Sequence, residues 1–144
     1  MCGIIGIISS KEVSSRIVNS LKKLEYRGYD SAGIATLVNG NINEVKCEGR
    51  VDVLEKDISK FNLKGDIGIG HVRWATHGKP STINAHPHSS EKVSVVHNGI
   101  IENSTILKKI LEKKGYIFKS QTDTEVIAHL FTEYLKKNSL KDTI

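Results

Sequence analysis

MCGIIGII, residues 1–8, opens the chain with an apolar run that directly follows a cysteine. A short apolar run of this kind predicts a buried β-strand. Such a strand would hold the N-terminus rigidly instead of leaving it to fray. Residues 11–25 follow with apolar side chains at helical spacing, which predicts an amphipathic helix capped by Ser9 or Ser10. The apolar face of that helix would be formed by Val13, Ile17, Leu21 and Leu24.

Strands and helices are expected to alternate along the remainder of the chain. In chain order, the sequence predicts strands over 34–38 and 42–47 joined by a turn at Asn39-Gly40, a helix over 51–61, strands over 67–72 and 93–97, a helix over 103–115, a strand over 116–119 and a helix that begins with a capping box from Thr122 to Glu125. Residues 73–90 show no periodicity and contain both prolines, which indicates a long functional loop. This order is typical of an α/β or α+β layered domain.

Composition and charge exclude several classes of protein. The net charge is +5, but the lysines occur in pairs on predicted solvent faces without aromatic residues between them, which argues against nucleic-acid binding. No apolar run is long enough to span a bilayer, and no basic segment precedes the first one, so we expect no membrane association and a cytoplasmic location. The two cysteines, Cys2 and Cys47, have neither a disulfide framework nor zinc-site spacing, so no metal or other cofactor is expected.

Cys2 has the chemistry of a nucleophile. Its small side chain should permit removal of Met1, which would leave Cys2 with a free α-amino group. An α-amine and a thiol both exchange protons close to neutral pH, so one residue would carry a nucleophile and its own base. The alternative is that Cys2 is merely a small residue on an ordinary core strand.

Six blocks of sequence carry a resemblance that no single block would establish. They are MCGIIG at 1–6, LEYRGYDSAGIA at 24–35, GHVRWATHGKPS at 70–81, NAHPH at 84–88, VVHNGIIEN at 95–103 and TDTEVIAHL at 122–130. In content and order they resemble the class II glutamine amidotransferase domain, a family of N-terminal nucleophile enzymes. Within that family they look most like the members that pass ammonia to fructose 6-phosphate, and members with other acceptors look different in the blocks at 24–35 and 70–81.

The resemblance implies an α+β fold, the four-layer α/β/β/α sandwich of the N-terminal nucleophile hydrolases. It implies hydrolysis of L-glutamine to glutamate, with the ammonia used by a sugar-phosphate isomerase domain or partner chain. The family's glutaminase domain continues well beyond position 144. Residues 1–144 would therefore be the N-terminal portion of a type 2 amidotransferase domain, truncated at the C-terminus, and they contain nothing that resembles the isomerase domain.

Four residues match the catalytic positions of the family. Cys2 would be the nucleophile, and Asn98 with Gly99 would form the oxyanion hole, whereas the local alternative for that pair is a tight turn after a strand. Arg27 would lie beside the nucleophile and help to keep its thiol ionised, the alternative being a surface ion pair with a neighbouring carboxylate.

Five more residues match positions that bind glutamine. Arg73 would hold the α-carboxylate with its planar fork. Asp123 would receive the α-ammonium, and the ordinary role of an aspartate there, which is to complement the dipole of the following helix, is compatible with that binding. Trp74, Thr76 and His77 resemble a segment that closes over the substrate, although Trp74 alternatively anchors its loop.

The remaining histidines are not assigned to chemistry. His71, His86 and His97 fall inside matching blocks and are interpreted as structural hydrogen-bonding residues. His88 and His129 look incidental.

Two hypotheses of different class stay open. The chain is a glutaminase half-site that needs a partner or a continuation to use the ammonia. Alternatively, it is an inactive remnant or glutamine-binding fragment, or it serves another acceptor. A homo-oligomer is compatible with the sequence, which does not set the oligomeric state.

Overall fold

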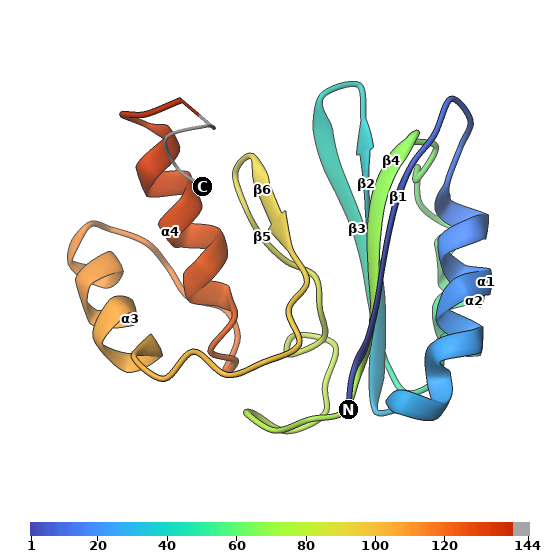
Figure 1. The fold of residues 1–144 in the computed structure, drawn as a ribbon, viewed down its shortest axis with the longest axis horizontal. Coiled ribbons are helices and arrows are strands. Elements are labelled where there is room, and N and C mark those ends of the chain that lie inside the picture. Colours follow the sequence, from blue (N-terminus) through green and yellow to red (C-terminus); the bar gives the residue numbers. More distant parts are fainter. Residues whose placement is uncertain (140–144) are drawn as a thin grey trace.

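Two antiparallel sheets lie between two pairs of helices in the computed structural model, which describes residues 1–139 (Figure 1). The elements are β1 (Gly3–Ile8), α1 (Ser14–Leu24), the 3-10 helix η1 (Glu25–Arg27), β2 (Ser31–Val38), β3 (Asn41–Glu48), α2 (Val51–Ile58), β4 (Ile67–Arg73), β5 (His88–Ser90), β6 (Val93–Val95), α3 (Ser104–Lys113) and α4 (Glu125–Leu135). Helices α1 and α2 cover the larger sheet, and α3 and α4 lie on the far side of the β5–β6 hairpin. The layers therefore follow the expected order α/β/β/α.

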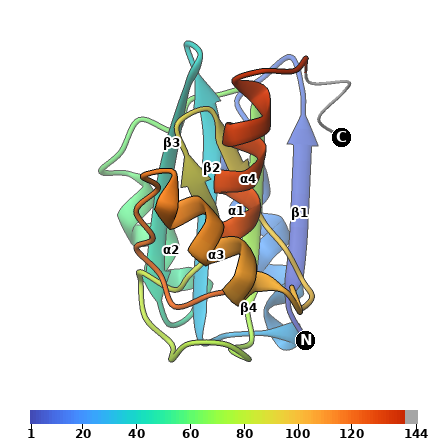
Figure 2. The ribbon, with the colours of Figure 1, turned by 90° about the vertical axis from the view of Figure 1, so that its left-hand side faces the viewer.

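The larger sheet has the strand order β1-β4-β2-β3. Within residues 1–139, strand β1 is consequently an edge strand and pairs only with β4, from Gly3 opposite Val72 to Ile8 opposite Ile67. Figure 2 looks onto α3 and α4, with β1 at one side of the sheet behind them. The prediction of a buried first strand holds for one face only: Ile5 and Ile7 pack against the core under α1, whereas Ile8 on the other face is 82% exposed.

The core lies between this sheet and helices α1 and α2. Val13, Ile17 and Leu21 are completely buried there, which confirms the predicted apolar face of the first helix. Gly70 of β4 lets α1 lie close to the sheet, since a Cβ atom on it would be 2.5 Å from Ile17 Cγ2. Such close approach is the usual reason for glycine inside a strand.

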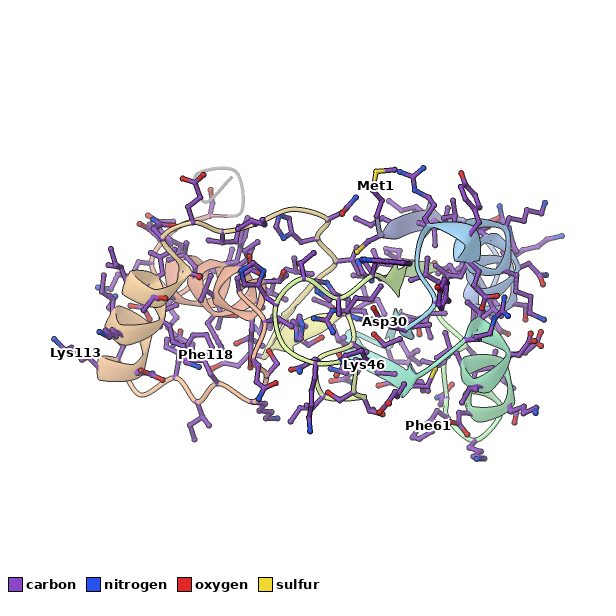
Figure 3. The ribbon with its side chains drawn as sticks, turned by 90° about the horizontal axis from the view of Figure 1, so that it is seen from below. Met1, Asp30, Lys46, Phe61, Lys113 and Phe118 are labelled. Carbon is purple, nitrogen blue, oxygen red and sulfur yellow. The ribbon has the colours of Figure 1, made fainter. Side chains whose placement is uncertain are left out.

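Helix ends agree with the sequence less well than helix faces. Neither Ser9 nor Ser10 caps α1: Val13 occupies the N-cap position, and the Ser9 hydroxyl accepts a hydrogen bond from Arg16. The next helix, α2, ends at Ile58, so Phe61 lies beyond it at the periphery with 55% of its surface exposed (Figure 3).

The hairpin turn between β2 and β3 lies where the sequence predicts it. Asn39 and Gly40 both have positive φ, as a tight hairpin between β2 and β3 requires.

The second half of the described chain departs most from the expectations. Residues 116–119 do not form a strand. The predicted capping box is absent too, because Glu125 accepts hydrogen bonds from the backbone of Lys119 and Ser120 instead. Helix α4 buries a mostly polar face that includes Glu125, His129 and Thr132. Over residues 1–139, no helix combines the length and apolarity that a membrane span needs.

Candidate active site

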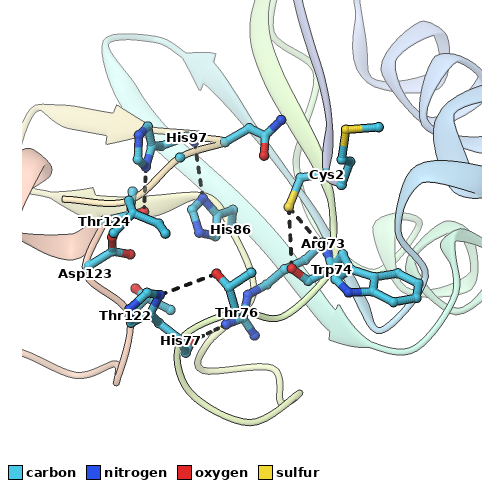
Figure 4. Close-up of a pocket in the computed structure, with 14 residues that line it drawn as sticks. Cys2, Arg73, Trp74, Thr76, His77, His86, His97, Thr122, Asp123 and Thr124 are labelled. Carbon is cyan, nitrogen blue, oxygen red and sulfur yellow. Dashed lines mark hydrogen bonds between the residues drawn. The ribbon is translucent and has the colours of Figure 1, made fainter. Parts of the chain in front are cut away.

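A cavity of about 290 Å³ lies where the two sheets meet the N-terminus (Figure 4). Its lining residues are Met1, Cys2, Arg73, Trp74, Thr76, His77, His86, His97, Asn98, Gly99, Ile100, Thr122, Asp123 and Thr124. The structure thus brings together every residue that the sequence singled out for catalysis or glutamine binding, except Arg27. Met1 lies at this cavity and is 76% exposed.

Strand pairing explains why residues distant in sequence meet here. Gly3 of β1 is opposite Val72 of β4, so Cys2 before the one and Arg73 after the other reach the same end of the sheet. The segment after β6 brings Asn98 and Gly99, and the segment before α4 brings Asp123.

The Cys2 sulfur contacts the backbone of Trp74. The Trp74 N–H donates to Sγ at 3.4 Å, and Sγ lies 3.7 Å from the Trp74 carbonyl oxygen. Arg27 Nε donates to the Cys2 carbonyl oxygen at 3.1 Å, so Arg27 lies beside Cys2 although it does not line the cavity. The alternative of a surface ion pair is not found for Arg27 among residues 1–139, since the neighbouring Glu25 pairs with Arg50.

Arg73 is a buried cation at the cavity wall. Only 4% of its surface is exposed, and its Nη2 donates to the carbonyl oxygens of His77 and, at 3.2 Å, Gly78. Its Nη1 has no hydrogen-bond partner within the described part of the chain. Burial lowers the pKa of Arg73, while the negative charge of Asp30 opposes that shift. A buried guanidinium nitrogen without an acceptor favours binding of an anion.

Asp123 supplies the opposite charge. Its Oδ2 accepts a hydrogen bond from the Ile101 N–H at 2.6 Å, which fixes the carboxylate against the segment before α3. Thr124, not Asp123, is the N-cap of α4, and the Asp123 side chain makes no hydrogen bond to that helix. The arrangement therefore leaves Asp123 available to a ligand in the cavity.

Asn98 and Gly99 are exposed to the cavity and follow β6. The backbone bends at Gly99, and within residues 1–139 no backbone hydrogen bond closes a turn across the pair. The Trp74 ring packs edge-on against Tyr29, with 5.6 Å between centroids. This contact agrees with the alternative role of Trp74 as an anchor for its loop.

Three histidines form a buried column between the sheets. The rings of His71 and His86 stack with 4.3 Å between centroids, and His88 meets His86 edge-on at 4.6 Å. Burial lowers the pKa of His71 to about 3 and that of His88 to about 4, and it lowers the pKa of His86 as well. All three are therefore neutral near pH 7.

The description of His88 and His129 as incidental is wrong. His88 Nε2 bonds to the Thr122 hydroxyl at 2.8 Å, and His129 Nδ1 bonds to the Ser90 hydroxyl at 2.9 Å, both in buried positions. His86 and His97, interpreted only as structural, also line the cavity. For His97 the available signal was its place next to Asn98 in the block at 95–103, whereas the block that holds His86 contains no predicted site residue.

Solved structures with the same fold include an amidotransferase. The whole chain superimposes on glutamine phosphoribosylpyrophosphate amidotransferase from B. subtilis with a TM-score of 0.80 and 32% identity, covering 31% of that chain. A structure described as the allosteric regulatory enzyme of purine biosynthesis gives a TM-score of 0.81 at 33% identity, with 32% of that chain covered. The expected N-terminal nucleophile fold is confirmed by these likenesses, which define the class as amidotransferase.

Sequence comparison gives the family. Residues 46–142 match the glutamine amidotransferase domain, and the chain belongs to this family. It is 57% identical over 136 residues to the isomerizing glutamine–fructose-6-phosphate aminotransferase of Bartonella henselae, and 56% identical over 146 aligned positions to that of Clostridium acetobutylicum. These alignments cover 94% and 100% of the chain, but only 22% and 24% of the relatives.

Proposed function

We propose that the cavity binds L-glutamine and hydrolyses its side-chain amide through Cys2. The observation that carries this proposal is the presence, in one cavity, of a thiol, an arginine with an unpaired buried nitrogen and a carboxylate. Arg73 and Asp123 match the two charges of a free amino acid, and Cys2 supplies the group that attacks the amide. Residues 1–144 would be the N-terminal portion of the amidotransferase domain.

The chemistry requires that Met1 be removed first, so that Cys2 has a free α-amine. That amine takes the thiol proton while the sulfur bonds to the carboxamide carbon. Asn98 and the Gly99 N–H would stabilise the oxyanion that forms. The C–N bond then breaks, and the α-ammonium gives its proton to the departing ammonia. Water adds to the resulting thioester, the C–S bond breaks, and glutamate leaves.

The acceptor of the ammonia is proposed from the relatives. Because the curated relatives are named for fructose 6-phosphate and are several times longer than this chain, we propose that a sugar-phosphate isomerase domain or partner chain uses the ammonia to aminate fructose 6-phosphate. The product would be glucosamine 6-phosphate, as in glucosamine-6-phosphate synthase. A cytoplasmic location and a homo-oligomer stay predictions from the sequence.

The test is the mass of the intact protein before and after incubation with a diazoketone analogue of glutamine, which alkylates such nucleophiles. We expect a parent mass short by one methionine and a single adduct on Cys2, together with release of ammonia from glutamine. Removal of Met1 with neither an adduct on Cys2 nor release of ammonia would contradict the proposal. Reversible glutamine binding without turnover would instead support the hypothesis of a glutamine-binding fragment.

Replacing Arg73 with lysine should raise the KM for glutamine roughly 10- to 150-fold, with a smaller change in kcat. A lysine ammonium cannot keep the two carbonyl contacts of Arg73 Nη2 and also present a donor in the place of Nη1. A hydrogen bond to a charged group contributes about 1.5–3 kcal/mol. Steady-state ammonia release measures both constants. Arg50→Lys is the matched control, because Arg50 is a surface arginine paired with Glu25 and should keep its KM. An unchanged KM in Arg73→Lys would remove Arg73 from the substrate site.

A further inference from the structure

His97 directly precedes the Asn98-Gly99 pair and is restrained from several sides. Its backbone N–H donates to His86 Nδ1 at 3.3 Å, and its ring Nδ1 lies 3.1 Å from the Thr124 hydroxyl (Figure 4). Because His86 Nδ1 accepts that bond, the neutral His86 ring carries its proton on Nε2. His97 is thus tied to both the histidine column and helix α4.

Gly99 lies directly on the His97 ring. A Cβ atom on Gly99 would be 2.6 Å from His97 Nε2 and 3.0 Å from Cε1, so the glycine backbone and the imidazole are already in contact. Asn98 and Gly99 are themselves exposed, and the Asn98 side chain makes no hydrogen bond within residues 1–139. The His97 ring is therefore a principal support of this segment.

The Thr124 hydroxyl bonds to the His97 ring and does not cap helix α4. Thr124 occupies the N-cap of α4, where a threonine hydroxyl ordinarily accepts from a free helix N–H. Here no such cap bond forms, and the hydroxyl, in a side chain only 2% exposed, bonds to His97 instead. The helix therefore lacks the free energy of that cap, and the hydroxyl fixes the orientation of one ring.

We propose that Thr124 is a positioning residue that acts through the His97 ring to hold Asn98 and Gly99 where the oxyanion forms. The inference rests on the proposed glutaminase function. Donors held in advance need no reorganisation as charge develops, whereas a displacement of about 1 Å costs as much as 100-fold in rate. Binding of the amino acid depends on Arg73 and Asp123, so loss of the Thr124 hydroxyl should lower kcat and leave KM almost unchanged.

The test compares Thr124→Val with Thr124→Ser. Valine keeps the shape of threonine but has no hydroxyl, and we expect kcat for glutamine hydrolysis to fall about 10- to 100-fold with KM within about twofold. Serine restores the hydroxyl and should recover kcat to within about threefold. Thr132→Val is the matched control, since it removes a similarly buried hydroxyl from the same helix, one that bonds to the Ser90 carbonyl and lies outside the cavity.

The backbone amide resonance of Gly99 in a ¹⁵N–¹H correlation spectrum gives a readout that does not need turnover. It should shift or broaden in Thr124→Val, return in Thr124→Ser and stay in place in Thr132→Val. If the unmodified protein fails to hydrolyse glutamine, the proposed function is lost, and this resonance alone decides the positioning role. An unchanged Gly99 resonance in Thr124→Val, or a kcat equal to that of the active parent, would overturn the inference.

Discussion

Cys2→Ala is expected to lower kcat for glutamine hydrolysis by at least about 10⁴-fold, the scale seen when a hydrolase loses its nucleophile. No other group in the cavity provides a thiol, and Cys47, the other cysteine, is buried in the core of the larger sheet. The substitution leaves Arg73 and Asp123 in place, so glutamine should bind with an affinity close to that of the parent. Ammonia release measures the first quantity, and titration calorimetry with glutamine measures the second.

Cys47→Ala is the control for the loss of a thiol. Burial raises the pKa of Cys47, which keeps this thiol protonated and unreactive, and its removal should leave kcat unchanged. Both alanine variants must also show the same far-ultraviolet circular dichroism as the parent. Turnover that survives in Cys2→Ala would contradict the assignment of the N-terminal nucleophile and transfer the chemistry to another group.

The sequence predicts this much of the site because six blocks together resemble one family, and the chemistry of each matched residue agrees with the role that the resemblance implies. Each predicted site residue lies in a short block whose residue types suit a single chemical role, such as a thiol at position 2, a planar cation at Arg73 and an amide beside a glycine at Asn98. No single block indicates that these residues line one cavity. Their convergence arises from strand register, because Gly3 pairs with Val72 and the cavity forms at the end of that pairing.

The errors have a common physical origin. Helix α4 buries Val126 and Ala128 together with polar side chains, and two of these, His129 and Thr132, bond to Ser90 of the β5–β6 hairpin. Ser90 on that hairpin accepts or donates the bonds that offset the cost of such burial. The face that a helix buries thus depends on the element that packs against it, and the spacing of apolar residues does not identify that element. The exposure of strand β1 likewise depends on its place at the edge of the sheet, which its own residues do not determine.

Gly33→Ala should lower the free energy of unfolding by about 3 kcal/mol, at the upper end of the usual cost of overpacking. Gly33 lies in β2, opposite His71 of β4 and beneath the loop that carries His86. A Cβ atom there would overlap the carbonyl oxygen of His86 and come within 2.9 Å of Lys46 Cγ. A lysine side chain can move aside, but the overlapping oxygen belongs to the backbone of a buried loop. The strand and the loop would have to separate.

Urea unfolding followed by circular dichroism measures this loss, with Gly6→Ala as the control. Gly6 lies on the edge strand β1 of the same sheet, where an added Cβ would meet only Ile69 Cγ2, at 4.0 Å. That substitution should change stability by less than about 1 kcal/mol, because alanine fits the position and restricts the unfolded chain. Equal midpoints for the two variants would show that the loop carrying His86 moves aside without a loss of stability. A lower midpoint for Gly33→Ala alone would show that the close contact between Gly33 of β2 and the backbone of His86 needs a residue without a Cβ atom.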